Sequence, residues 1–127
     1  MDLHLLFAWT WILIGLLTGT LLGLYFARDD WLGGYTSWPR RLVRLGHIAF
    51  VGTGLLNLGA HWTLQAVSAE PATATAVRAL FVAGAVLMPL LCFAAAFHRQ
   101  LRHAFALPIA ALGGGSGVLL HLVTNTR

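Results

Sequence analysis

Four long apolar stretches, separated by short polar segments, dominate the order of residues along the chain. They cover about residues 5–27, 40–67, 74–97 and 101–123. A helix needs about 20 apolar residues to cross the roughly 30 Å hydrocarbon core of a bilayer, and each stretch is long enough. Because the connections are short, the pattern predicts an all-α membrane protein with four transmembrane helices in one up-down-up-down bundle. The whole chain, residues 1–127, is then a single domain.

Composition supports the same class and excludes several others. Of the 127 residues, 58% are hydrophobic and 9% are charged, and the mean hydropathy is +0.78. These values are too apolar for a soluble domain of this size. There is no nucleotide-binding glycine motif and no pair of carboxylates within the apolar stretches, and the single cysteine, Cys92, forms no disulfide framework. The predicted surroundings are the lipid bilayer and other membrane subunits, not a nucleic acid.

Arginines supply the expected orientation. Six of the eight lie in or beside the first and third connections: Arg28, Arg40, Arg41, Arg44, Arg99 and Arg102. The opposite side carries Arg78 and Arg127. Cytoplasmic loops carry the excess of basic residues. We therefore predict a multi-pass protein of the inner (plasma) membrane, with both termini on the non-cytoplasmic side.

Local signals within the stretches predict how the helices begin and pack. Gly15, Gly19 and Gly23 share one face of the first helix, and such small-residue ladders allow close helix–helix approach. Trp11 suits the membrane interface. Pro39 fits the first turn of the second helix, with a capping residue such as Ser37 before it.

Histidines are the candidate chemistry, since an ionisable residue inside a membrane marks a functional site by default. His47 and His61 are fourteen residues apart, so at about 100° per residue they share one face to within roughly 40°. Their spacing is roughly 21 Å along a helix. Gly54 lies midway on that face, where a large flat group could approach the backbone.

The fourth stretch has a related pattern. His103 and His121 are eighteen residues apart, which is five helical turns, and small residues follow the face between them, including Gly114 and Gly117. Two such helices could hold stacked tetrapyrroles between them. Neutral imidazole is a suitable axial ligand for haem iron, and helical bundles carry cofactors in their cores.

The spacing of His47, Gly54 and His61 resembles the haem-binding helix of the membrane cytochrome b superfamily. The resemblance implies a four-helix bundle holding b haem, with His47 and His61 as axial ligands. It implies His121 as the partner on the outer side. The inner partner is His103 or His98, or the inner site is empty, because the spacing of eighteen departs from the family pattern. Arg44 and its neighbouring arginines would pair with haem propionates or with a quinone headgroup.

Three functions remain open from the sequence. The first is a haem b protein that carries electrons within a membrane redox complex, with a quinol as one candidate partner. The second is a non-catalytic accessory or assembly subunit of a respiratory or photosynthetic complex, without its own cofactor. The third, a transporter or channel element, for example for a metal ion bound by histidines, is weakest because acidic residues are missing from the spans. The histidines also have plain interpretations: His4, His98 and His103 suit a headgroup layer, His47 a basic interface, and Asn57 an interhelical hydrogen bond.

Overall fold

The computed structural model describes residues 2–125, so Arg127 of the orientation argument lies outside the described residues. Within that range the chain is all-helical, without strands, and four helices are long and apolar enough to cross a membrane. The elements are α1 (Leu3–Gly23), η1 (Trp31–Gly33), α2 (Trp38–Ala66), α3 (Pro71–Phe97), η2 (Arg99–Phe105) and α4 (Ala106–Asn125). The predicted fold class is confirmed at this level: the described chain is all-α, with four helices able to span a membrane by length and composition.

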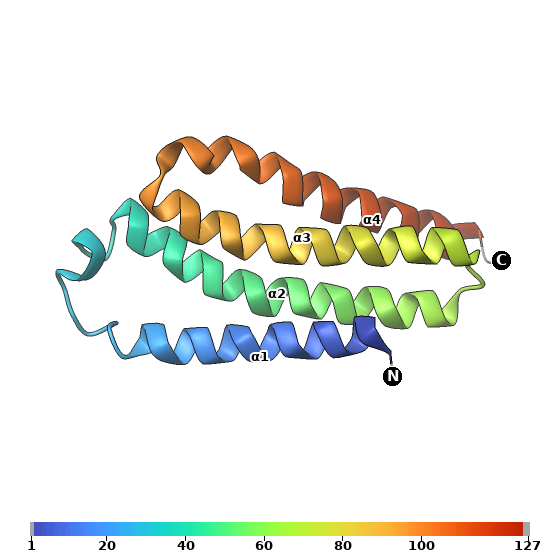
Figure 1. Ribbon diagram of the computed structural model, residues 1–127, viewed down its shortest axis with the longest axis horizontal. Helices are drawn as coiled ribbons and strands as arrows, with labels where there is room; N and C mark the ends of the chain where they lie inside the picture. The colour runs from blue at the N-terminus through green and yellow to red at the C-terminus, as the bar shows by residue number, and fades with distance from the viewer. Residues whose placement is uncertain (1, 126–127) are drawn as a thin grey trace.

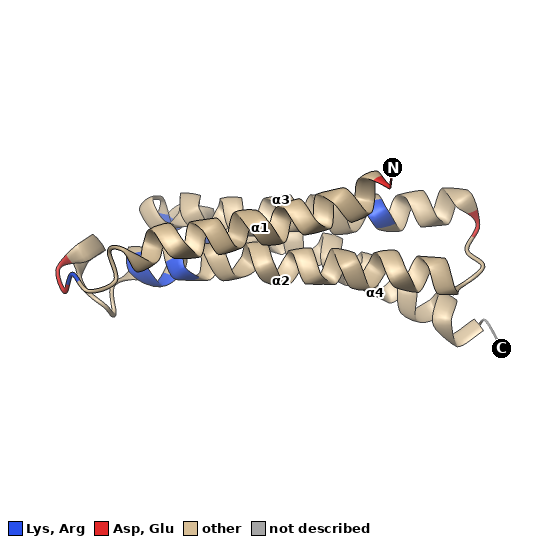
Figure 2. Cartoon of the chain, turned by 90° about the horizontal axis from the view of Figure 1, so that it is seen from below, with Lys and Arg blue, Asp and Glu red and all other residues tan. Residues whose placement is uncertain are grey.

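The helices lie side by side in chain order (Figure 1). α1 packs on α2, α2 on α3 and α3 on α4, whereas α2 and α4 touch only slightly. α1 and α4 are therefore outer helices. The start of α1 and the end of α4 lie toward the same end of the molecule (Figure 1). Most basic residues gather at the opposite end, beside η1 (Figure 2).

Capping sets two of the helix starts. The Asp2 carboxylate accepts hydrogen bonds from the amides of His4 (3.0 Å) and Leu5 (3.1 Å) at the start of α1. Ser37 caps α2 as predicted, and its hydroxyl accepts from the Arg40 amide at 3.3 Å. Side-chain oxygens at this position satisfy amides that have no partner within the helix.

The fourth helix starts later than predicted. Residues 99–105 form the 3₁₀ helix η2, and the α-helix begins only at Ala106. Pro108 explains the boundary, because proline lacks an amide hydrogen and is favoured in the first turn of a helix rather than in its interior.

Glycines bring the helices into close contact. A Cβ atom on Gly15 of α1 would lie 2.7 Å from Val51 Cγ2 of α2. One on Gly54 of α2 would lie 2.6 Å from Ile12 Cγ1 of α1. Gly23, by contrast, has nothing within 4 Å of its Cβ position. The predicted ladder on α1 is thus a packing surface at Gly15, while Gly23 lies beyond the contact with α2.

A proline inside α3 creates an additional link to α1. Pro89 has no amide hydrogen, so the carbonyl of Ala85, four residues earlier, loses its helical hydrogen bond. The indole Nε1–H of Trp11 donates to that carbonyl at 3.0 Å. Trp11, predicted as an interface anchor, instead points into the protein because a buried acceptor is available there.

Arg40 holds the loop between α1 and α2 (residues 24–37, the α1–α2 loop). Its side chain is 2% exposed and donates to the carbonyls of Phe26 (2.8 Å) and Arg28 (3.1 Å). The guanidinium also lies over the rings of Phe26, Trp31 and Tyr35 at 5.3–5.6 Å. This arginine is therefore committed to the fold and does not face anionic lipid.

Candidate functional site

The histidines occupy three different parts of the described chain. His4 and His61 are buried together at one end of α1 and α2. His47 is half-buried on α2, toward the basic end. His98, His103 and His121 are exposed. Among the described residues no three histidine, cysteine or acidic side chains converge as a metal site would require.

His61 faces α1, not α4. Its ring centroid is 6.0 Å from that of His4, with the planes inclined at 47°. Its Nδ1 lies 3.5 Å from the carboxylate of Asp2, which makes an ion pair whenever the imidazole is protonated. His61 and His4 are 6% and 7% exposed, so the two imidazoles are buried, while Asp2 lies exposed beside them at the end of the molecule where α1 begins.

Asn57 belongs to the same cluster of polar side chains and connects α1, α2 and α3 by hydrogen bonds. Its amide oxygen lies 2.9 Å from Nε2 of His4 on α1. Its amide nitrogen donates to the carbonyl of Thr53 on α2 (2.8 Å) and to the carbonyl of Phe81 on α3 (3.2 Å). Asn57 is 0% exposed. The predicted interhelical hydrogen bond of Asn57 is confirmed, and a buried side-chain amide that uses both donors and its oxygen is a structural connector.

Asp2, which lies just before α1, has a lowered pKa. The main cause is the hydrogen bond from the Leu5 amide, and the nearby charges of His61 and Arg78 act in the same direction against desolvation. Asp2 therefore remains a carboxylate at neutral pH and stabilises the first turn of α1 as its cap.

The exposed histidines have only local partners. His121 on α4 pairs with Asn125, whose amide nitrogen lies 3.1 Å from His121 Nδ1. In η2, Nε of Arg102 donates to Nε2 of His103 at 3.2 Å. His98 ends α3 and is exposed. The structure therefore brings neither His121 to His61 nor His103 or His98 to His47.

The space predicted for flat rings between α2 and α4 is not formed by the described residues. The backbone at Gly54 is covered by Ile12 of α1, and Gly114 and Gly117 lie on an exposed face of α4 with nothing within 4 Å. Gly115 is the glycine of this run that packs, against Phe81 of α3. These residues do not fit two haems held between α2 and α4, and haem binding by this chain stays a prediction.

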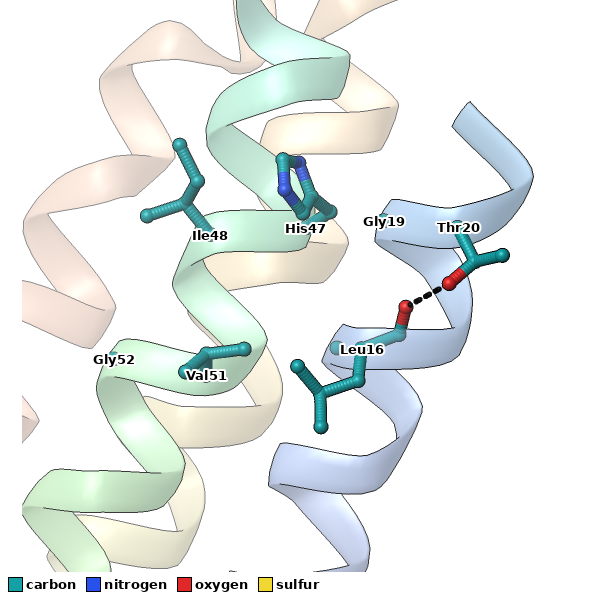
Figure 3. Close-up of a pocket in the computed structure, with 8 residues that line it drawn as sticks. Leu16, Gly19, Thr20, His47, Ile48, Val51 and Gly52 are labelled. Carbon is teal, nitrogen blue, oxygen red and sulfur yellow. Dashed lines mark hydrogen bonds between the residues drawn. The ribbon is translucent and has the colours of Figure 1, made fainter. Parts of the chain in front are cut away.

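A groove between α1 and α2 lies beside His47 (Figure 3). Its volume is about 650 Å³. Eight residues line it: Gly15, Leu16, Gly19 and Thr20 from α1, and His47, Ile48, Val51 and Gly52 from α2. The ring of His47 rests on Gly19, where a Cβ atom would lie 3.0 Å from Cδ2 of the imidazole. A glycine is needed here because the ring occupies the place of a side chain.

Arg44 lies near this groove along α2 but is engaged elsewhere. Its guanidinium lies over the rings of Tyr35 (4.8 Å) and Phe26 (5.9 Å), and the residue is half-buried. Arg44 thus helps Arg40 to hold the α1–α2 loop. No described contact directs it toward a ring between α2 and α4.

Asp2 and His4 are the site residues that the sequence interpretation underrated. Their signal was present: His4 is in the first turn of α1, at the same end of the molecule as His61, and Asn57 lies one helical turn before His61. A buried asparagine needs several hydrogen-bond partners. That need could have directed attention to the nearest polar side chains on other helices.

The geometry thus divides into a polar cluster, in which His4, Asn57 and His61 are buried and Asp2 is exposed at the edge, and a lateral groove beside His47. The comparisons add no relative, since no protein-family model, no curated protein and no solved structure matches this chain.

Proposed function

We propose that this chain is a non-catalytic accessory subunit of a larger complex in the inner membrane. It crosses the bilayer four times in an up-down-up-down order, with both termini on the non-cytoplasmic side, as the arginine distribution favours. The four helices and the gathering of basic residues at one end support this arrangement. Its role is to bind a neighbouring subunit through the outer helix α4.

The observation that carries the proposal is the outer face of α4. Its exposed small residues, spaced along one side of the helix, are Ala106, Ala110, Gly113, Gly114 and Gly117. The three glycines have nothing within 4 Å of their Cβ positions. We call these five residues the α4 small-residue face.

A helix gains nothing from glycines that face lipid. Each costs about 1 kcal/mol of helix stability relative to alanine. In a membrane, this loss of stability is offset when a second helix packs closely against the small residues, because packing rather than the hydrophobic effect drives helix association there. Nothing within the described chain packs on this face. A helix of another subunit is the occupant that would explain it.

A haem b electron carrier is the second candidate, and His47 is the observation that favours it. Neither ring nitrogen of His47 makes a hydrogen bond within the described chain, and Nδ1 is buried. Neutral imidazole is a suitable axial ligand, and a bound b haem would supply one-electron chemistry at its iron. No second described imidazole lines the groove, so another chain would have to provide any further ligand.

The test uses the chain purified from its own membranes in mild detergent. A photo-reactive residue in place of Gly117 should crosslink one defined partner, whereas the same residue in place of the exposed Leu17 on α1 should not. Gly114→Leu should release that partner while leaving the chain folded, because its Cβ position is open.

Two results would decide against the accessory role. One is a lone monomer whose behaviour is unchanged by Gly114→Leu. The other is a reduced-minus-oxidised spectrum with sharp b-type bands that disappear in His47→Phe, which would favour the haem carrier. Bands that persist in that variant would show that any haem belongs to another chain.

A further inference from the structure

The groove between α1 and α2 has an open side and a polar group within it. Leu16, Gly19 and Thr20 on α1 and His47, Ile48, Val51 and Gly52 on α2 line it, and Figure 3 shows His47 and Val51 directed toward α1. Its volume of about 650 Å³ lies within the range of small-molecule sites, which is roughly 300–1,000 Å³. Gly52 is exposed and has nothing within 4 Å of its Cβ position, so the groove opens sideways beside it.

The imidazole of His47 lacks a partner in an apolar setting. The other polar side chain in the groove, Thr20, donates its hydroxyl hydrogen bond to the Leu16 carbonyl at 3.0 Å. Within the described chain no hydrogen bond reaches either nitrogen of His47. Leaving such a group unpaired away from water is unfavourable. Whatever occupies the groove should therefore offer the ring a hydrogen bond.

The depth of His47 excludes most polar partners. α2 has 29 residues and is about 44 Å long, which exceeds a roughly 30 Å apolar core by about 14 Å. His47 lies nine residues after Trp38, or about 14 Å along the helix, so a centred helix places it roughly 7 Å inside the core. A lipid headgroup would not reach it easily, and an acyl chain carries no hydrogen-bonding atom.

The walls of the groove suit an apolar ring that carries a tail. Val51 already covers Gly15 and the His47 ring covers Gly19, so among the lining glycines Gly52 is the one with open space beside it, and the other walls are the apolar Leu16, Ile48 and Val51. A ring can lie beside His47 between these apolar side chains, and an apolar tail can leave past Gly52 into the lipid. A helix of another subunit fits less well, because its backbone hydrogen bonds are already made.

We propose that this groove binds a lipid-soluble quinone or quinol, with His47 hydrogen-bonded to one ring oxygen. The ring enters sideways from the bilayer and its tail remains in lipid. Imidazole suits both forms, since it can donate to a carbonyl oxygen or accept from a hydroxyl group. The site does not depend on the accessory role, which concerns the α4 small-residue face.

Decylubiquinone is the probe, titrated into nanodiscs that hold the full chain labelled with ¹⁵N-histidine. The ring-nitrogen resonances of His47 should shift and saturate, while those of the exposed His121 should not move. Decylbenzene has an apolar tail on a ring without oxygen, and it should leave His47 unchanged. This comparison needs no variant and therefore cannot be confused with misfolding.

A matched pair of variants then tests whether the quinone binds in the groove. Gly52→Leu fills the groove, and Gly59→Leu adds the same side chain seven residues later on α2, outside the groove. Both Cβ positions are open, so both variants should fold. Gly52→Leu should weaken the response of His47 at least tenfold, and Gly59→Leu should change it less than twofold.

Several outcomes would overturn the proposal. An equal response to decylbenzene would mean that the groove takes any apolar chain. If the His47 response to decylubiquinone weakens equally in the two glycine variants, the quinone only partitions into the bilayer and does not bind in the groove. No response of His47 would remove the site, and b-type absorbance bands that depend on His47 would assign the groove to haem instead.

Discussion

The hydrogen bond from Trp11 to Ala85 leads to a prediction about how a proline is tolerated inside a membrane helix. Ala85 is 0% exposed, and its carbonyl has no helical donor because Pro89 is four residues further along α3. Trp11→Phe removes the indole donor but keeps an aromatic ring beside Phe7 and Phe50. The variant leaves a buried carbonyl without a partner.

The expected cost is about 1–2 kcal/mol of unfolding free energy. An unsatisfied buried acceptor costs about 1–3 kcal/mol in proteins generally. Side-chain hydrogen bonds between membrane helices average about 0.6 kcal/mol, with a maximum near 1.7. The assay is reversible unfolding by SDS titration from mixed micelles, followed by circular dichroism. Trp9→Phe is the matched control, since Trp9 is exposed on the same helix and should cost close to nothing.

A double-mutant cycle isolates the hydrogen bond from the loss of ring area. Pro89→Ala returns an amide hydrogen to α3, which can then bond the Ala85 carbonyl. In that background Trp11→Phe should reduce the unfolding free energy only through lost ring packing, because no carbonyl is left unpaired. The two changes should therefore show a coupling energy of about 1 kcal/mol. If Trp11→Phe costs the same with and without Pro89, the tryptophan does not replace the missing helical bond, and this reasoning is wrong.

Three further predictions concern the polar side chains. Asn57→Leu keeps the volume but removes three hydrogen bonds, so it should cost about 2–4 kcal/mol in the same SDS titration; a cost below about 0.5 kcal/mol would contradict its connecting role. Arg40→Met should make the α1–α2 loop more sensitive to trypsin, whereas Arg41→Met, at an exposed position, should not. The amide resonance of Leu5 should titrate with the Asp2 carboxylate at a pKa below its ordinary value. The stability that the Asp2 cap gives to α1 is thus fully present above about pH 4 and is lost as the pH falls through that lowered pKa. An ordinary or raised pKa of Asp2 would show that its carboxylate does not stabilise the helix start.

The amino-acid sequence alone determined the class of this protein and much of its local structure. Apolar stretches of about 20 residues can satisfy their backbone groups in lipid only as helices, so four such stretches mean four helices. Ser37 and Pro39 mark the start of α2 because capping is a local interaction. Asn57 had to find partners because a buried amide is costly when unpaired.

Only the tertiary structure decided which helix faces which. The spacing of His47, Gly54 and His61 correctly placed them along one side of α2, but α1, not α4, covers Gly54 and approaches His61. Gly114 and Gly117, expected to lie against a cofactor, face outward on α4. Periodicity identifies the residues that share a face. In a bilayer, however, lipid is as apolar as a neighbouring helix, so an apolar or glycine-rich face does not reveal what will cover it.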